Sequence, residues 1–450
     1  MPAPDSLAAD LRRVIADAQG EKRLPSVAAA VVRDGEVVWA DAVGLADAES
    51  GEDATPDHQY RVGSITKTFT AVSIMQLRAE GKLELDDRLD AHLDVPVHGA
   101  LTIRRMLAHA SGLQREIPGD VWETLAFPRS TPELLKALED AELVLGPGER
   151  WHYSNLAYIL LGEVVAKLSG IAYEDYVDTR VLEPLGLSRT GFAPESPTAI
   201  AYRVDPYSDV VHREPMMVER VGGLAAAGQL WSTVEDLGRW ASFLAEPDER
   251  VLADDAVELM TSVQSMADPY RWQLAWGVGL MLARDGEHVY CGHDGGMPGY
   301  VAIVIASRED KIGAAVLVNG GNFGPIEISF QLLRKVREQL PPERPAWRPA
   351  AGAPDELATV LGRWWSEGVE FVLRWHDGRL EARWADAADW QPWARFEPLG
   401  HDRFRTVFGR ERGELLRIVR AEDGTPTKLY WATYPMTRDP EGFGADASRP

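Results

Sequence analysis

The chain has 450 residues, of which 45% are hydrophobic and 26% are charged. This is the composition of a soluble globular protein with one large and one smaller domain, and it excludes collagen-like, disordered and low-complexity classes. The 47 Lys and Arg against 70 Asp and Glu give a formal net charge of -23, which repels nucleic-acid phosphates and anionic lipid, so we expect neither nucleic acid nor a membrane as a partner.

Cysteine content and the N-terminal residues bear on the cellular compartment. Cys291 is the single cysteine, which excludes an internal disulfide and a multi-thiolate metal site. The first residues lack a basic leader followed by an apolar stretch, and no run of about 18 uncharged apolar residues occurs. We therefore expect a cytoplasmic protein that uses no metal or other cofactor.

The first elements along the chain are a hairpin and a helix. Apolar, β-branched residues over 27–45 flank Asp34-Gly35, a dipeptide typical of tight hairpin turns. Apolar residues at helical spacing over 65–76 then predict a helix that begins close to Ser64. The chain thus opens with sheet and continues with a buried helix.

The rest of the first domain adds helices and then further strands. A helix is expected over 156–168, ended by Gly170. Later strands and a final helix are expected over 276–283, 288–291, 300–306, 312–319 and 326–340. Helices inserted between the first and last strands of one antiparallel sheet predict an α+β fold in which helices flank the sheet.

Proline marks the boundary between the two domains. Five prolines fall within residues 341–354, which predicts a semi-rigid linker after a first domain spanning 1–340. Short alternating segments separated by turns then predict a small antiparallel β barrel or sandwich over 355–450. Eight of the 15 Trp lie after residue 345, where they either fill the core or hold a ligand.

A serine and a lysine stand three residues apart where an extended segment meets the first apolar helix. Ser64 needs a base to become a nucleophile, and Lys67 lies one turn further along the same helix face. The positive end of a helix also disfavours the ammonium form of a buried lysine. Because a single Ser-x-x-Lys match is weak, the alternative is an exposed lysine on a helix face.

A second group of chemically capable residues precedes the helix over 156–168. Tyr153 beside a lysine can relay a proton, and the amide of Asn155 can both donate to and accept from an acyl substrate. The alternative is that Ser154 or Asn155 only caps the following helix.

The third group is His293-Asp294-Gly295-Gly296, between two strand-like segments. Its glycines let the backbone approach a ligand closely, so the N–H of Gly296 could join that of Ser64 as an oxyanion hole. The alternative is a glycine-rich turn with a solvent-facing histidine.

In this order, the three groups resemble the penicillin-recognising serine hydrolases related to class C β-lactamases, which include D,D-peptidases, D-aminopeptidases and family VIII-type esterases. The resemblance covers about residues 5–340 and includes the segment from Met106 to Leu113. The resemblance implies that Ser64 is the acylated nucleophile and that Lys67 and Tyr153 together act as the general base. It also implies that Asn155 contacts the substrate and that His293 lies beside the acyl group. His109 belongs to a landmark of this family that looks structural. The C-terminal domain resembles the lipocalin-like domains appended to some relatives.

One departure from the family pattern bears on the substrate. Relatives that bind β-lactams or D-Ala-D-Ala place hydroxyl residues where this chain has Asp294 and Gly296. An acid there repels a carboxylate and favours an amine, so β-lactamase and D,D-carboxypeptidase activities are not expected. What remains is hydrolysis, or acyl transfer, on a small-molecule ester or amide.

Three other readings stay open at this point. Cys291 could be the nucleophile, because it lies two residues from His293. Ser64 could be acylated without turnover in a sensor or penicillin-binding protein whose barrel holds a ligand. A metallohydrolase has little support, since the chain has no His-x-His or His-x-x-x-His spacing. The oligomeric state is not determined by the sequence.

Overall fold

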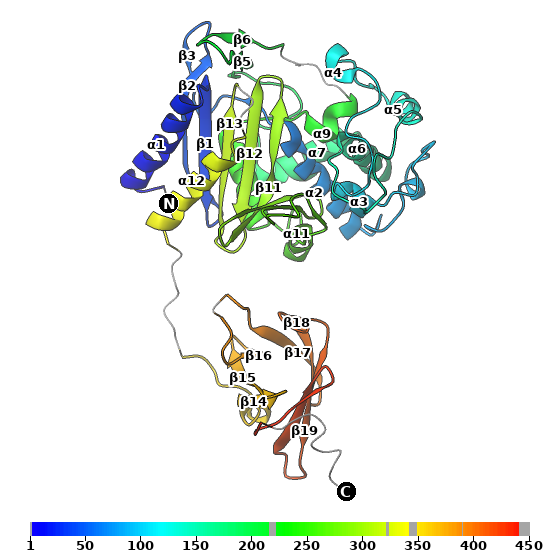
Figure 1. Cartoon of the computed structure of the whole chain (residues 1–450), viewed down its shortest axis with the longest axis vertical. Helices are drawn as coiled ribbons and strands as arrows, with labels where there is room; N and C mark the ends of the chain where they lie inside the picture. The colour runs from blue at the N-terminus through cyan, green and yellow to red at the C-terminus, as the bar shows by residue number, and fades with distance from the viewer. Residues whose placement is uncertain (1, 216–221, 321–323, 342–348, 389, 441–450) are drawn as a thin grey trace. The chain divides into compact units, whose positions relative to one another are not determined.

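The computed structural model describes residues 2–215, 222–320, 324–341, 349–388 and 390–440. Contacts divide the chain into two units, Met1–Pro342 and Glu343–Pro450 (Figure 1). Half of the predicted linker over 341–354 lies outside the described residues, as does the end of the second predicted domain. Each unit is described by itself.

A nine-stranded antiparallel sheet forms the centre of the first unit, in the order β3-β2-β1-β13-β12-β11-β10-β9-β8 (Figure 1). Its strands are β1 Ser26–Arg33, β2 Glu36–Asp47, β3 Glu52–Asp53, β8 Ser265–Met266, β9 Leu274–Trp276, β10 Met281–Asp285, β11 His288–Met297, β12 Tyr300–Ser307 and β13 Ile312–Val318. The last strand of the unit pairs with the first, because Val27 is opposite Val318. The predicted α+β class with one antiparallel sheet is confirmed.

Helices cover both faces of this sheet. On one face lie α1 (Asp5–Glu21) and α12 (Ile326–Gln339), and their apolar residues share a core cluster with alternate residues of β1. The intervening residues of β1 face a second cluster, which contains α2 (Thr66–Ala79), α6 (Asn155–Ser169) and α10 (Val234–Ala245). Successive side chains of a strand point to opposite faces, so a strand that is covered on both sides is apolar on both. Strand β1 is accordingly apolar from Val27 to Val32.

Shorter elements connect these layers. They are η1 Gly63–Ile65, η2 Leu89–Ala91, α3 Ile103–Leu107, α4 Val121–Thr124, α5 Thr131–Leu138, α7 Tyr173–Val177, η3 Asp178–Leu182, α8 Glu183–Leu185, η4 Gly222–Leu224, α9 Ala225–Gly228, α11 Asp254–Met260, and the strand pairs β4 Tyr60–Arg61 with β7 Trp231–Ser232 and β5 Tyr202–Val204 with β6 Val211–Arg213. Within the described ranges, no single helix is long and apolar enough to cross a membrane, although α6 and the segment Tyr173–Leu185, bent by 75°, pass that test as a pair.

Two local expectations are confirmed and two are wrong. The hairpin turns at Asp34-Gly35, whose φ angles of 47° and 83° suit a type I′ turn, and α6 ends at Gly170. The predicted strand over 276–283 is instead two strands, because the chain turns where the N–H of Gly277 donates to the carbonyl of Leu280 at 2.8 Å. The glycine-rich segment after Cys291 is not a turn but the continuation of β11.

The second unit is an up-and-down antiparallel barrel of eight strands in chain order, preceded by α13 (Asp355–Ala358). Its strands are β14 Gly362–Ser366, β15 Val369–His376, β16 Arg379–Trp384, β17 Ala394–Gly400, β18 Arg403–Phe408, β19 Leu415–Arg420, β20 Pro426–Trp431 and β21 Tyr434–Met436. Two backbone hydrogen bonds between Trp365 and Thr437, of 2.8 and 2.9 Å, join the ends of the sheet. The barrel is therefore the correct alternative, with Trp364 and Trp431 in its core and Trp390 79% exposed.

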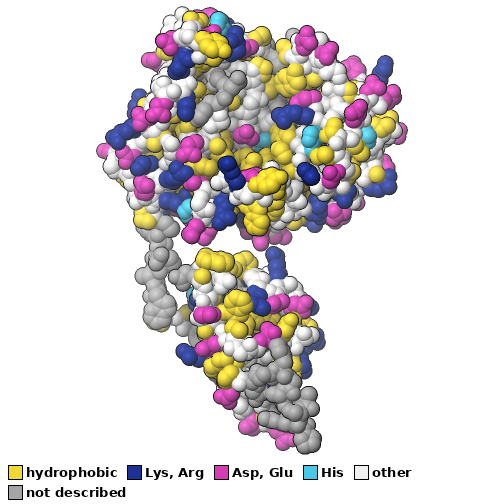
Figure 2. Space-filling view, in the orientation of Figure 1, with side chains coloured by type: hydrophobic (Ala, Val, Ile, Leu, Met, Phe, Trp, Pro, Cys, Tyr) yellow, Lys and Arg dark blue, Asp and Glu magenta, His cyan; other side chains and the backbone are white. Residues whose placement is uncertain are grey.

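On the face of the molecule shown in Figure 2, basic and acidic side chains are interspersed over the first unit. Many of them form exposed ion pairs, such as Arg104 with Asp86 at 2.8 Å. Pairs of this kind contribute little to stability individually, so the fold depends on the two apolar clusters of the sheet.

Candidate active site

Ser64 lies in η1, the single turn that leads directly into α2. The hydroxyl of Thr66 donates to the carbonyl of Gly63 at 2.7 Å, which holds the turn in place. One turn further, Lys67 Nζ donates to Ser64 Oγ at 3.0 Å and to the carbonyl of Ala227 at 2.5 Å. The predicted contact between the serine and the lysine is present, and it is made within one helical segment.

Lys67 is completely buried, with 0% of its surface exposed. Burial lowers the pKa of its amine from the ordinary value of 10.5 to about 7. Glu116 and Asp294 oppose this shift, whereas Arg115 adds to it. The alternative of a lysine on an exposed helix face is wrong, and near pH 7 about half of these amines are in the uncharged form.

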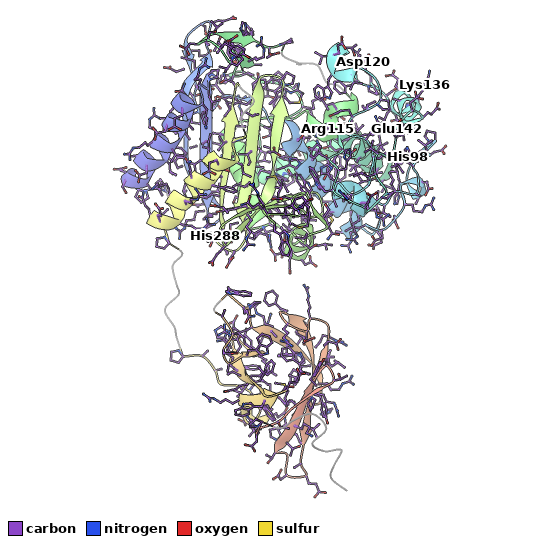
Figure 3. All side chains as sticks on the ribbon, viewed as in Figure 1. His98, Arg115, Asp120, Lys136, Glu142 and His288 are labelled. Atoms are coloured by element: carbon purple, nitrogen blue, oxygen red, sulfur yellow. The ribbon has the colours of Figure 1, made fainter. Side chains whose placement is uncertain are left out.

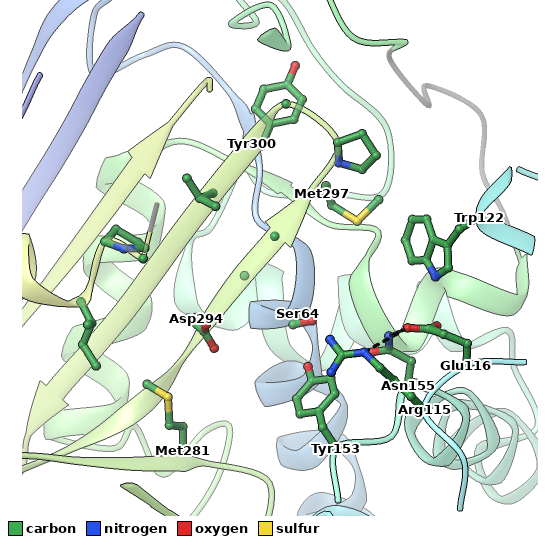
Figure 4. Close-up of a pocket in the computed structure, with 18 of the residues that line it drawn as sticks. Ser64, Arg115, Glu116, Trp122, Tyr153, Asn155, Met281, Asp294, Met297 and Tyr300 are labelled. Atoms are coloured by element: carbon green, nitrogen blue, oxygen red, sulfur yellow. Dashed lines mark hydrogen bonds and ion pairs between the residues drawn. The ribbon is translucent and has the colours of Figure 1, made fainter. Parts of the chain in front are cut away.

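Tyr153 brings a phenol to the same point from a different part of the chain (Figure 4). Its ring centroid lies 5.1 Å from Lys67 Nζ. Burial raises the pKa of the Tyr153 phenol well above its usual range, while a hydrogen bond with Ser64 lowers it. The phenol is therefore protonated at rest, next to both the hydroxyl and the amine.

Asn155 begins α6, and its neighbour Ser154 is the helix cap that accepts a hydrogen bond from Ala157 N at 3.1 Å. The capping alternative is therefore correct for Ser154. Asn155 lines the same cavity as Ser64, and its Nδ2 donates to Glu116 Oε1 at 2.6 Å (Figure 4). In this contact with Glu116, the amide nitrogen of Asn155 is the bonded atom and the amide oxygen is not.

The second half of β11 runs directly beside η1. Strand β10 pairs with β11 only as far as Gly292, which leaves the following edge to contact the Ser64 turn. A Cβ on Gly295 would lie 1.9 Å from the carbonyl oxygen of Val62 and 3.2 Å from the N atom of Ser64, so only glycine allows this approach. A Cβ on Gly63 would lie 2.7 Å from the N atom of Gly296. The amides of Ser64 and Gly296 are thus brought together at one end of the cavity.

His293 packs against Tyr153 and is not among the residues that line the cavity. Because strand residues alternate, His293 shares a face of β11 with Gly295, which approaches the Ser64 turn, and its side chain is 0% exposed. Its ring centroid lies 6.0 Å from that of Tyr153, and its Nδ1 lies 2.5 Å from the carbonyl oxygen of Asp294. Burial lowers its pKa to about 4, so the ring is neutral. The alternative of a solvent-facing histidine is also wrong.

Arg115 and Glu116 lie at the site although sequence reasoning did not find them. Both come from the segment between α3 and α4, and Arg115 is labelled in Figure 3. The guanidinium carbon of Arg115 lies 4.8 Å from the centre of the Tyr153 ring, and Glu116 bonds to Asn155. No spacing in the sequence indicates that Arg115 and Glu116 lie near Ser64. The sequence feature that could have pointed to them is their position shortly after the Met106–Leu113 segment.

These groups open into a cavity of about 990 Å³. Its wall contains both apolar and charged side chains. The apolar residues include Trp151, Leu274, Trp276 and Met281, and the charged ones are Arg115, Glu116, Arg203, Glu214 and Asp294. Among the described residues, no group of three or more His, Cys, Asp or Glu is placed to hold a metal ion.

Cys291, the alternative nucleophile, lies in the core. It is 3% exposed, and burial raises the pKa of its thiol to about 11. A thiol of this kind carries almost no thiolate near neutral pH, so nothing at Cys291 favours it as a nucleophile.

Comparisons with known proteins agree with this architecture. The β-lactamase family model matches residues 11–330, and the chain belongs to that family. Residues 353–438 match a domain family of unknown function, DUF7586. The barrel thus has relatives, but their family carries no assigned role.

Individual relatives are named as an esterase, a penicillin-binding protein homologue and an amidohydrolase. The chain is 34% identical to esterase EstB of Burkholderia gladioli over 221 residues, which are 45% of this chain and 55% of the esterase. The octameric penicillin-binding protein homologue of Pyrococcus abyssi has a TM-score of 0.64 and 26% identity, covering 96% of this chain and 99% of that chain. A D-stereospecific amidohydrolase from Streptomyces sp. has a TM-score of 0.61 and 28% identity, covering 73% and 98%. The chain spans 60% of the length of its staphylococcal curated relatives, which are 25% identical to it.

Proposed function

We propose that this protein is a serine hydrolase that acts on a small-molecule ester or amide through an acyl-enzyme at Ser64. The observation that carries the proposal is the buried Lys67 amine, 3.0 Å from Ser64 Oγ, with its pKa lowered to about 7. A general base is most effective when its pKa lies near the working pH, and this one is already in contact with the nucleophile.

The first half-reaction follows from this contact. Ser64 Oγ attacks the substrate carbonyl as its proton passes to the Lys67 and Tyr153 pair, and the developing oxyanion accepts hydrogen bonds from the N–H groups of Ser64 and Gly296. The pair then gives the proton to the departing alcohol or amine when the ester or amide bond breaks. Either member of the pair is placed to take the first proton, because both form a hydrogen bond with Ser64.

The second half-reaction restores the enzyme. Water attacks the acyl carbon, gives one proton to the same pair and releases the carboxylic acid, while Ser64 Oγ takes the proton back. An alcohol or amine that replaces water at this step gives acyl transfer instead. The cavity of about 990 Å³ has room for such an acceptor beside the acyl group.

The charges around Ser64 favour a particular class of substrate. The Asp294 carboxylate lies on the cavity wall, 61% exposed, and Glu116 lies at the neighbouring Asn155. Glu116 is paired with Arg115 at 3.5 Å, so Asp294 is the acid that repels a substrate carboxylate and attracts an ammonium, and the apolar wall suits a hydrophobic side chain. We therefore propose esters or amides whose acyl part carries an amine. The names of EstB and of the Streptomyces amidohydrolase agree with the two bond types.

A substrate panel with detection of the intact protein mass tests this proposal. The panel contains short-chain nitrophenyl esters, D- and L-aminoacyl amides and nitrocefin. We expect turnover of one or more esters or amides, a transient gain of the acyl mass, and loss of both in Ser64→Ala with the fold retained. Wild-type activity in Ser64→Ala contradicts the assignment. A stable adduct without a second turnover shows a sensor rather than a hydrolase.

A further inference from the structure

His109 follows α3 and contacts the segment His152-Tyr153-Ser154 through its backbone carbonyl, its ring nitrogen and its ring face. It is 0% exposed and has a φ of 51°, in the left-handed region that few residues other than glycine and asparagine adopt. A buried histidine in this conformation persists only where surrounding contacts hold it. Those contacts converge on the tripeptide that carries the phenol.

His109 accepts two hydrogen bonds, one from the residue on each side of Tyr153. The N–H of His152 donates to the carbonyl of His109 at 2.7 Å, and the N–H of Ser154 donates to His109 Nδ1 at 3.1 Å. The residues before and after Tyr153 are thus tied to the same partner, which fixes the backbone from which the phenol projects. Because Nδ1 accepts, the neutral ring carries its proton on Nε2.

The ring of His109 also fixes the orientation of the phenol. Its centroid lies 4.1 Å from that of Tyr153, with 29° between the planes. Tyr158, whose hydroxyl donates to the carbonyl of Leu107 at 2.8 Å, packs 5.1 Å from His109 and holds it from another side. Burial keeps the pKa of His109 well below its ordinary value, so the ring stays neutral beside Lys67.

We propose that His109 is a positioning residue whose Nδ1 acceptor and stacked ring hold the Tyr153 phenol against Ser64 and Lys67. The inference rests on the proposed function, because it assigns His109 an effect on the acylation of Ser64. His109 touches neither the cavity nor the reacting atoms, and it acts only through Tyr153. Displacing a catalytic group by about 1 Å costs roughly 100-fold in rate, which sets the size of the expected effect.

The experiment compares two substitutions that both tolerate the left-handed backbone. His109→Asn keeps an acceptor near the position of Nδ1, whereas His109→Gly removes the acceptor and the ring. Each variant is made in the full chain and in a Tyr153→Phe background. Ser26→Ala, which removes a buried hydroxyl bonded to Asn319 at 2.6 Å on β1, is the control for loss of a buried hydrogen bond. The readouts are the rate of Ser64 acylation by a nitrophenyl ester, KM and the thermal midpoint.

We expect His109→Gly to lower the acylation rate about 100-fold with little change in KM, and His109→Asn to stay within about tenfold of the wild type. In the Tyr153→Phe background, His109→Gly lowers the rate less than about twofold further, because the group that it positions is gone. If His109→Gly does not fold, His109→Gln replaces it, since its amide reaches the position of Nε2 rather than Nδ1.

Two outcomes overturn the inference. In one, both glycine and glutamine variants acylate at the wild-type rate. In the other, the loss is equally large with and without the Tyr153 hydroxyl, or is matched by Ser26→Ala, so that His109 acts on the fold generally. A wild-type protein that never gains the acyl mass at Ser64 overturns the proposed function itself, and this outcome is read before any variant is made.

Discussion

The two units of the chain treat their buried polar groups differently. In the barrel, Trp364 Nε1 donates to the carbonyl of Val360 at 2.7 Å, Trp431 Nε1 donates to Thr406 Oγ1 at 2.9 Å, and Glu381 pairs with Arg374 at 2.8 Å. Around Tyr153 in the first unit, several buried nitrogens have no hydrogen-bond partner among the described residues. They are His109 Nε2, Trp151 Nε1, His152 Nε2, Trp276 Nε1 and His293 Nε2.

This difference separates a scaffold from a site. A scaffold gains stability when its buried donors are paired, and the two indoles of the barrel core follow that rule, whereas Arg383 Nε in the barrel does not. A catalytic site keeps unpaired donors and a desolvated amine because these groups must meet a substrate, water or a moving proton, at a cost in stability. The contrast predicts that changes near Ser64 alter activity more than stability, and that changes in the barrel do the reverse.

Lys67→Met is the substitution with the largest expected effect. It replaces the amine by an apolar side chain of similar length, so the base contact with Ser64 Oγ is lost. We expect kcat/KM to fall roughly 1,000-fold or more, since base catalysis and activation of the nucleophile disappear together. The expected loss is checked by measuring ester hydrolysis by Lys67→Met, both alone and combined with Ser64→Ala. Residual activity above about a tenth of the wild-type value contradicts the role of the lysine.

The same variant tests the cost of the buried amine. The unfolded chain binds the lysine proton with a pKa near 10.5 and the native chain with a pKa of about 7, so this residue makes the native state less stable below pH 7. The penalty fades as pH rises from about 7 to 10.5. We expect Lys67→Met to unfold at a higher denaturant concentration than the wild type at pH 6, with the difference shrinking towards pH 10. A difference that grows with pH contradicts the lowered pKa.

Gly295→Ala tests the close approach of β11 to the Ser64 turn. The added methyl would lie 1.9 Å from the Val62 carbonyl oxygen, so the strand or the turn must move and the two amides of the proposed oxyanion hole separate. We expect a loss of kcat of about 100-fold with KM little changed. Gly296→Ala, whose Cβ would meet no atom within 4 Å, is the matched comparison and is expected to lose less than about tenfold. Equal losses in both variants contradict the steric explanation.

Part of this site was predictable and part was not, for physical reasons. Ser64 and Lys67 are one turn apart, so spacing alone brings them together, and the apolar period of α2 shows that this face is buried. The period of two in a strand also implies that His293 shares a face of β11 with Gly295, which is the face that meets the Ser64 turn. Arg115 could not be found, because its place over Tyr153 depends on how the loop after α3 packs against α6.

Asp294→Asn is expected to change selectivity more than rate. The carboxylate is largely exposed, so removing its charge alters the attraction to a substrate ammonium by about 1 kcal/mol. We expect the ratio of kcat/KM for an aminoacyl ester over its uncharged analogue to fall about 3- to 10-fold, with the uncharged ester hardly affected. Raising the ionic strength should shrink the wild-type ratio in the same direction. An unchanged ratio removes the acid from substrate recognition.

The smallest effect on the site is expected from Thr406→Val in the barrel. The substitution keeps the side-chain volume but removes the acceptor of the Trp431 indole N–H, which leaves a buried donor unpaired. We expect the barrel to lose about 1–3 kcal/mol of stability.

The two units have separate cores, so calorimetry should show one transition moving to lower temperature while the transition of the first unit stays in place. If both transitions move together, the units do not unfold independently, and the division between a paired scaffold and an unpaired site must be drawn within one cooperative structure.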